Sequence, residues 1–248
     1  MLQLRKPPLF SVALISAAAL AYEILLMRLL SIIHWHHFAY MIISVALLGY
    51  GASGTFLSLS QNRLKGRFSS AFIVNAVLFG LTSVACYAVA QSLPFNALEL
   101  LWDPLQPLWL LSIYLLLFIP FFCAANCICL CFSEFPQHMH RVYSFDLLGA
   151  GLGGLLAIAL LFLLMPVTAL RVIALLGLFT AFVAMLELRK GSPAWKFIFL
   201  LIFVVVAAST HGLSLNLSQF KGLSQAMNVQ GAGIVDSRSS PLGLLTTL

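Results

Sequence analysis

Long apolar runs separated by short polar stretches most strongly constrain the fold of this chain. A helix that crosses a membrane needs about 20 predominantly apolar residues, and the sequence offers about seven such stretches. A tight turn at Met165-Pro166-Val167 separates the fifth from the sixth, and the last stretch is short. We predict an all-α, polytopic transmembrane helical bundle of seven, or alternatively six, spans. The spans are predicted near residues 9–33, 38–59, 70–92, 106–132, 145–165, 168–187 and 196–211.

The composition excludes water-soluble classes of protein. Only 8% of the 248 residues are charged and 62% are hydrophobic, whereas a soluble domain has about 25% charged and 45–50% apolar residues. A soluble enzyme and a DNA-binding module are therefore excluded. The net charge of +6 comes from Lys and Arg in short loops, a pattern that encodes orientation in a membrane. We expect the lipid bilayer as a partner and no nucleic acid.

The positive charges in short loops predict a cytoplasmic N-terminus, because Lys and Arg concentrate on the cytoplasmic side. The loop at 93–105 would then lie outside, and it carries Glu99 and Asp103 without a positive charge. We expect a multi-pass protein of the cell (inner) membrane. The inside segments would hold Arg5, Lys6, Arg63, Lys65, Arg67, Arg141, Arg189, Lys190 and Lys196, and the outside ones Arg171, Lys221 and Arg238.

The first apolar stretch has a second interpretation as a signal peptide. Arg5 and Lys6 precede it, and Ala19-Leu20-Ala21 is similar to a cleavage site. The apolar sequence continues to Ile33, however, which is longer than the apolar region of a signal peptide. A retained span is the favoured interpretation.

Three ionisable residues fall within predicted spans: Glu23 and Arg28 in the first, and Asp146 at the mouth of the fifth. Each costs at least about 2.5–3.5 kcal/mol at a helix centre, so each marks a candidate site. Glu23 and Arg28 are five residues apart, about 140° around a helix, and we expect each to pair across helices. They form either a structural ion-pair cluster, which is favoured, or the lining of a proton or substrate path.

His34, His36 and His37 follow the first span and surround Trp35. Neutral His is the commonest metal ligand, so a haem or metal site is one interpretation. His and Trp also suit the membrane interface, and this second interpretation is favoured. We expect no cofactor in this chain.

Cys123, Cys127, Cys129 and Cys131 lie within a predicted span, and three of them share a helical face. Zinc sites typically combine two separate Cys pairs, and the sequence contains no second pair. Because cysteine is a small, often buried side chain, packing is the favoured role, with His138 and His140 leaving a weaker metal alternative.

Glycines mark two candidate helix-packing faces. Residues 149–154 match G-x-G-x-x-G, but no strand precedes them and an apolar span follows, so the dinucleotide-binding interpretation fails. Gly149 and Gly153 instead form a small-xxx-small face that permits close helix approach. The second span has a similar face, formed by Gly49, Gly51 and Gly54. We expect these two helices to pack together or to form a dimer contact.

The composition changes after residue 211, which divides the chain into a bundle at 1–211 and a polar tail at 212–248. The tail is rich in Gly and Ser, and residues 242–248 have the pattern of a strand. Fewer than about 40 residues rarely bury a core of their own. The tail therefore has the character of the start of a second domain that is truncated or missing.

Several of these segments resemble spermidine synthase-like integral membrane proteins. The matching stretches are AYEILLMRLLS at 21–31, HFAY at 37–40, YSFDLLGAGLG at 143–153, FKGLSQA at 220–226 and RSSPLG at 238–243. In that family a multi-span region precedes an aminopropyltransferase-like domain, which would lie beyond Leu248. The resemblance implies the membrane half of such a protein and assigns no catalytic residue here.

Three functions follow from these observations. The leading one is a non-catalytic membrane anchor or accessory domain, with other membrane subunits, a second copy or a separate soluble domain as partner. The second is a small transporter that uses Glu23, Arg28 and Asp146, and the third is a redox subunit that binds haem or metal through His34, His36 and His37. The anchor function meets one conflict. Seven crossings would place the tail outside the cell, whereas the aminopropyl donor of a spermidine synthase-like domain is found in the cytosol.

Overall fold

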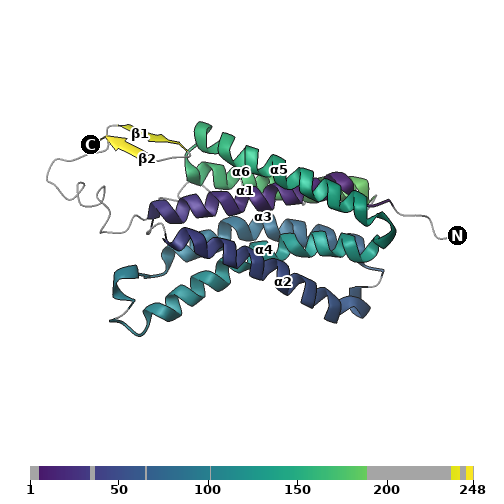
Figure 1. Cartoon of the computed structure of the whole chain (residues 1–248), viewed down its shortest axis with the longest axis horizontal. Helices are drawn as coiled ribbons and strands as arrows, with labels where there is room; N and C mark the ends of the chain where they lie inside the picture. Colours follow the sequence, from purple (N-terminus) through teal and green to yellow (C-terminus); the bar gives the residue numbers. More distant parts are fainter. Residues whose placement is uncertain are drawn as a thin grey trace, which may run out of the picture.

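The computed structural model describes residues 6–33, 37–64, 66–100, 102–188, 236–240 and 244–247. These residues form a bundle of long helices and one small hairpin (Figure 1). The elements are α1 (Leu9–Ile33), α2 (His37–Leu64), α3 (Phe68–Ser92), η1 (Ala97–Glu99), α4 (Gln106–Glu134), η2 (Pro136–His138), α5 (Met139–Leu163), α6 (Pro166–Glu187), β1 (Asp236–Ser239) and β2 (Leu244–Thr247).

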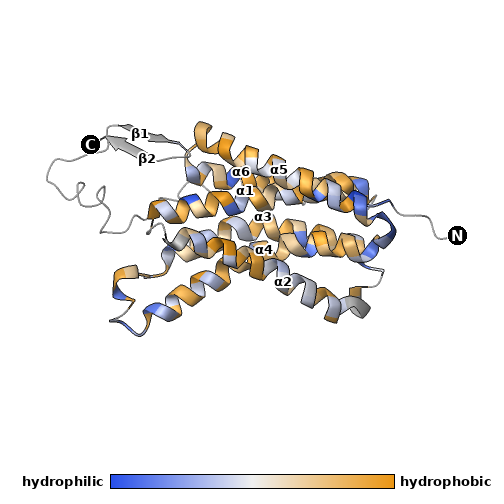
Figure 2. Ribbon diagram, viewed as in Figure 1, coloured by the Kyte–Doolittle hydropathy of each residue, from blue (hydrophilic) through white to orange (hydrophobic). Residues whose placement is uncertain are grey.

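Six of the described helices are long and apolar enough to cross a membrane, which confirms the predicted helical bundle. Hydrophobic residues predominate along the helices and hydrophilic ones gather toward their ends (Figure 2). The chain is by these criteria a multi-pass membrane protein. The turn before α6 is also confirmed, since Met165 is extended and Pro166 opens the helix. The predicted span near 196–211 lies outside the described residues.

Helix α1 lies at the centre of the bundle, between α5 and α6 on one side and α2 and α4 on the other (Figure 1). Tyr22 marks its middle and is completely buried. Its ring packs against Phe79 of α3 and Phe121 of α4, and its hydroxyl donates to the Ser83 carbonyl oxygen at 3.2 Å. One side chain thus joins three helices at mid-bundle.

Two glycines bring α5 into direct contact with the backbone of α1. A Cβ added to Gly149 would lie 2.2 Å from the Ala13 carbonyl oxygen, and one added to Gly153 would lie 2.2 Å from that of Ala17. The two contacts advance by four residues on both helices, so α1 and α5 run parallel. The small-residue face predicted for α5 is therefore a packing face.

Of the two alternatives for the glycine-rich helices, packing against each other is wrong, and a dimer contact stays a prediction. The partner of α5 is α1, whereas α2 packs mainly on α4. Gly49 is at that contact, where an added Cβ would lie 2.7 Å from the Cβ of Phe121. Gly51 and Gly54 have nothing within 4 Å of an added Cβ. Which helix packs against a glycine depends on how closely the backbone of the facing helix can approach. The sequence of one helix alone does not determine this.

The C-terminal hairpin pairs β1 with β2 in antiparallel register, with Asp236 opposite Thr247 and Ser239 opposite Leu244. The strand predicted at 242–248 is thus present as β2. Strand β1 contacts α5. The hairpin lies at the end of the bundle opposite to the first turn of α1 (Figure 1).

Candidate intramembrane polar site

Asp146 is held against α1 by a hydrogen bond. The Ser16 hydroxyl lies 2.5 Å from Asp146 Oδ1 and 2.9 Å from the Val12 carbonyl oxygen. A hydroxyl has one proton, so Ser16 can donate to only one of these acceptors at a time. Asp146 itself is half-buried on the face of α5 that is turned toward α1.

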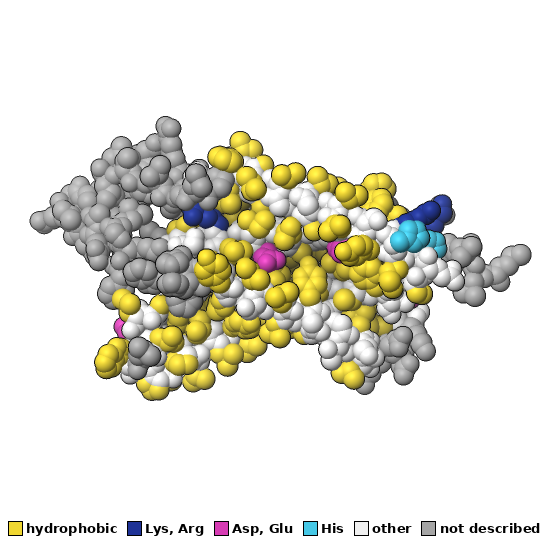
Figure 3. All heavy atoms as spheres, viewed as in Figure 1, with side chains coloured by type: hydrophobic (Ala, Val, Ile, Leu, Met, Phe, Trp, Pro, Cys, Tyr) yellow, Lys and Arg dark blue, Asp and Glu magenta, His cyan; other side chains and the backbone are white. Residues whose placement is uncertain are grey.

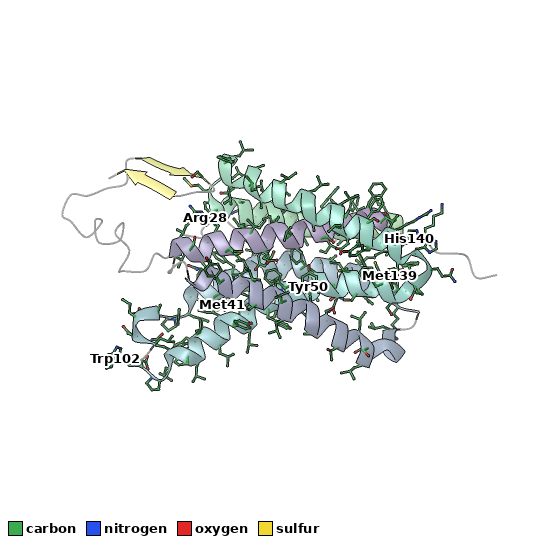
Figure 4. All side chains as sticks on the ribbon, viewed as in Figure 1. Arg28, Met41, Tyr50, Trp102, Met139 and His140 are labelled. Atoms are coloured by element: carbon green, nitrogen blue, oxygen red, sulfur yellow. The ribbon has the colours of Figure 1, made fainter. Side chains whose placement is uncertain are left out.

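Glu23 lies on the same face of α1 as Ser16, one heptad further along the helix and about 10 Å away. It is half-buried. Tyr50 of α2 lies within electrostatic range of both Glu23 and Asp146, and it lies near the middle of the bundle (Figure 4). Figure 3 shows acidic side chains set within the hydrophobic surface of this region. Two carboxyl groups and a phenol therefore gather where α1, α2 and α5 meet.

Arg28 does not belong to this group. It lies about 18 Å beyond Ser16 along α1, and its Nη2 donates to the Ser240 carbonyl oxygen at 3.4 Å. Within the described part of the chain, the hydrogen-bond partners of Asp146 and Arg28 are Ser16 and Ser240, and no ion pair joins them to each other or to Glu23. The expected ion-pair cluster of Glu23, Arg28 and Asp146 is therefore not formed, because Asp146 of α5 lies at the level of Ser16, whereas Glu23 and Arg28 lie at two levels further along α1.

Glu187 is a carboxylate that joins two helices, a role that the sequence pattern did not indicate. It is the last residue of α6, and it accepts hydrogen bonds from the backbone N–H groups of Phe10 at 3.2 Å and Ser11 at 3.0 Å, and from the Ser11 hydroxyl. The first N–H groups of a helix have no partner within the helix, and negative charge there is favourable. A residue from the end of α6 thus caps the start of α1. Its position at the end of an apolar span concealed this role.

A buried amide network was also missed. The Ser53 hydroxyl of α2 donates to Asn126 Oδ1 of α4 at 2.7 Å, and Asn126 Nδ2 donates to Asn75 Oδ1 of α3 at 3.1 Å. Asn75 Nδ2 in turn donates to the Ala71 carbonyl oxygen at 2.8 Å. Asn126 is only 2% exposed. The signal in the sequence is a lone Asn among the cysteines of an apolar span, where an uncharged polar side chain needs a hydrogen-bond partner.

The cysteines of α4 pack in the core. Cys123, Cys127 and Cys131 are buried and free, while Cys129 is half-buried. The Cys127 thiol donates to the Phe72 carbonyl oxygen at 3.5 Å. Among the described residues, no group of three or more His, Cys, Asp or Glu is placed to hold a metal ion. His34, Trp35 and His36 lie outside the described residues, and His37 is described only as the first residue of α2.

Comparison with protein-family models, with curated proteins and with solved structures finds no match to this chain.

Proposed function

We propose that the chain is a membrane-embedded anchor or accessory domain of a spermidine synthase-like protein and is not catalytic by itself. The observation that carries this proposal is the attachment of the C-terminal hairpin to the bundle. Arg28 donates to the Ser240 carbonyl oxygen, and β1 contacts α5. The helices thus contact the hairpin that follows them in the chain, as expected of a membrane anchor that positions a C-terminal segment.

Two contacts at opposite ends of the bundle support a particular sidedness. Glu187, at the end of α6, contacts Ser11, whereas Ser240 contacts Arg28. Ser11 and Arg28 are about 25 Å apart along the axis of α1. The chain after α6 therefore reaches the opposite end of the bundle. We infer that the hairpin lies across the membrane from the N-terminus, and that with a cytoplasmic N-terminus it lies outside.

An external hairpin favours the accessory role over polyamine synthesis, because an aminopropyl donor is a cytosolic nucleotide derivative. The partner would then be another membrane subunit, a second copy or a separate domain on the outer side. The resemblance of residues 21–31 and 143–153 to spermidine synthase-like membrane regions supports the same proposal.

The sidedness is tested with single reporter cysteines, Lys6→Cys and Ser237→Cys, in a chain whose native cysteines are replaced. A membrane-impermeant thiol reagent on intact cells is expected to label Ser237→Cys and to leave Lys6→Cys protected until lysis. Labelling of both or of neither on intact cells would contradict the inferred crossing. Aminopropyl transfer by the purified chain would contradict the non-catalytic role.

A second candidate function is transport of a proton or an organic cation along the face of α1. The observation that favours it is the grouping of Glu23, Tyr50 and Asp146 within a hydrophobic surface, since ionisable residues at membrane depth commonly mark ion paths. Uptake of a polyamine into proteoliposomes is the test. Uptake that Glu23→Gln and Asp146→Asn leave unchanged would exclude this path.

A further inference from the structure

An apolar hollow lies beside the junction of α4 and α5. Its lining residues are Phe132 of α4 and Met139, His140 and Tyr143 of α5, and its volume is about 640 Å³, within the range of about 300–1,000 Å³ typical of small-molecule sites. It exists because α5 packs on α1 through Gly149 and Gly153, so that its first turns stand beside α4 with little direct packing.

The hollow opens on the surface that the membrane covers. Met139 and Tyr143 are 49% and 57% exposed, and Leu147, one turn further along α5, is 61% exposed. An acyl chain that enters the hollow can therefore continue along α5 toward the middle of the bilayer without crossing a polar loop.

Side chains that can donate hydrogen bonds to an anion border the mouth of the hollow. His140 lines it, and Arg141 is the next residue and is exposed. Phe10 of α1 packs edge-on against Phe145 of α5, with ring centroids 6.0 Å apart, and this contact brings the start of α1, where exposed Lys6 lies, to the same end. Figure 3 shows the histidines beside Lys and Arg at this end, and Figure 4 places Met139 and His140 there.

Among the described residues, the acidic side chains toward this end of the bundle are Glu134, Asp146 and Glu187, all within electrostatic range of Cys131. Glu134 ends α4 on the exposed surface. Glu187 is engaged by Phe10 and Ser11. Because Asp146 is also engaged, by Ser16, Glu134 is the exposed carboxylate described near exposed Arg141 and Lys6. The free basic side chains at the mouth of the hollow therefore favour an anion, and the walls favour hydrocarbon.

We propose that this hollow binds an anionic phospholipid, with one acyl chain between Phe132 and Tyr143 and the phosphate at His140 and Arg141. In the orientation argued above, the site faces the cytoplasmic leaflet, where Lys and Arg side chains attract anionic headgroups. This inference does not depend on the anchor role and holds if that role fails.

The test is competitive lipid retention by the purified full chain, measured by native mass spectrometry with dioleoyl phosphatidylglycerol and dioleoyl phosphatidylcholine. Retention of the anionic lipid is expected to exceed that of the neutral lipid by about fivefold, the effect of one cationic side chain at an anionic surface. The preference is expected to disappear in the His140→Ala/Arg141→Gln variant, while retention of phosphatidylcholine, which reports folding, stays unchanged.

Arg67→Gln is the matched control, because Arg67 is exposed on the loop before α3 and does not line the hollow. It is expected to keep the preference. Glycerophosphoglycerol, which has the headgroup without acyl chains, is expected not to compete. Equal retention of the two lipids, an equal loss in Arg67→Gln, or full competition by the free headgroup would each overturn the proposal.

Discussion

Glu187 caps the first turn of α1 although it lies 176 residues from Ser11 in the chain, and its carboxylate accepts from the Ser11 N–H at 3.0 Å. We expect Glu187→Ala to lower the free energy of unfolding by about 1–2 kcal/mol, the range for helix caps and for charges at helix termini. Detergent-based chemical unfolding measures this. Glu134→Ala is the control, because Glu134 is exposed at the end of α4, and an equal loss there would rule out a specific cap.

The contact between α1 and α5 makes Gly149 and Gly153 intolerant of a side chain. Gly149→Ala and Gly153→Ala are expected to destabilise the bundle by about 1–3 kcal/mol, because the new Cβ must displace the backbone of α1. Gly151→Ala is the matched control, since nothing lies within 4 Å of its added Cβ, and it is expected to be neutral or slightly stabilising. Thermal unfolding of the three variants in one detergent tests this, and a similar loss in all three would refute the close contact.

The amide network predicts that Asn126→Ala costs about 1 kcal/mol, the typical order for an interhelical hydrogen bond in a membrane protein. Part of this stabilising free energy comes from the hydrogen bond that Ser53 donates to the Asn126 side chain, so replacing either residue removes the same interaction. In a double-mutant cycle, Ser53→Ala is therefore expected to add little once Asn126 is replaced. Thr55→Ala, which removes a hydroxyl bonded only within α2, is expected to be neutral. Additive losses for Ser53 and Asn126 would argue against the network.

Asp146 and Ser16 support a prediction about conservative substitution. Asp146→Asn is expected to retain the stability of the bundle, because the amide can donate to the Ser16 hydroxyl while Ser16 donates to Val12. Asp146→Ala is expected to lose about 1 kcal/mol. The difference between the two variants should vanish in a Ser16→Ala background. Its persistence there would assign the effect to another contact of Asp146.

The helical spans were predictable because their length and apolar content are properties of single segments. The packing faces were predictable only in part: the spacing of Gly149 and Gly153 indicated a close contact, but nothing in it indicated α1 as the partner. The ion-pair expectation for Glu23, Arg28 and Asp146 failed for a related reason. Two charged side chains on neighbouring helices can pair only if they lie at the same height along the bundle axis. Here the three charged groups are spread from the height of Ser16 to the height of Arg28. Asn126 and Asn75 were predictable as a polar contact, because each is an uncharged polar residue within an apolar span.

The residues that bond to α1 are far from it in the chain, so these contacts can form only late in synthesis. Helix α1 is made first, but the carboxyl group that bonds to Ser16 follows 130 residues later and the one that bonds to Ser11 follows 176 residues later. At about 5–20 residues per second, α1 waits roughly 10–35 s for Glu187. During that interval the N–H groups of Phe10 and Ser11 have no native acceptor, and for the earlier part of it the face for α5 has no native partner either. We therefore expect the nascent first helix to depend on the insertion machinery or a chaperone until the sixth helix has been inserted.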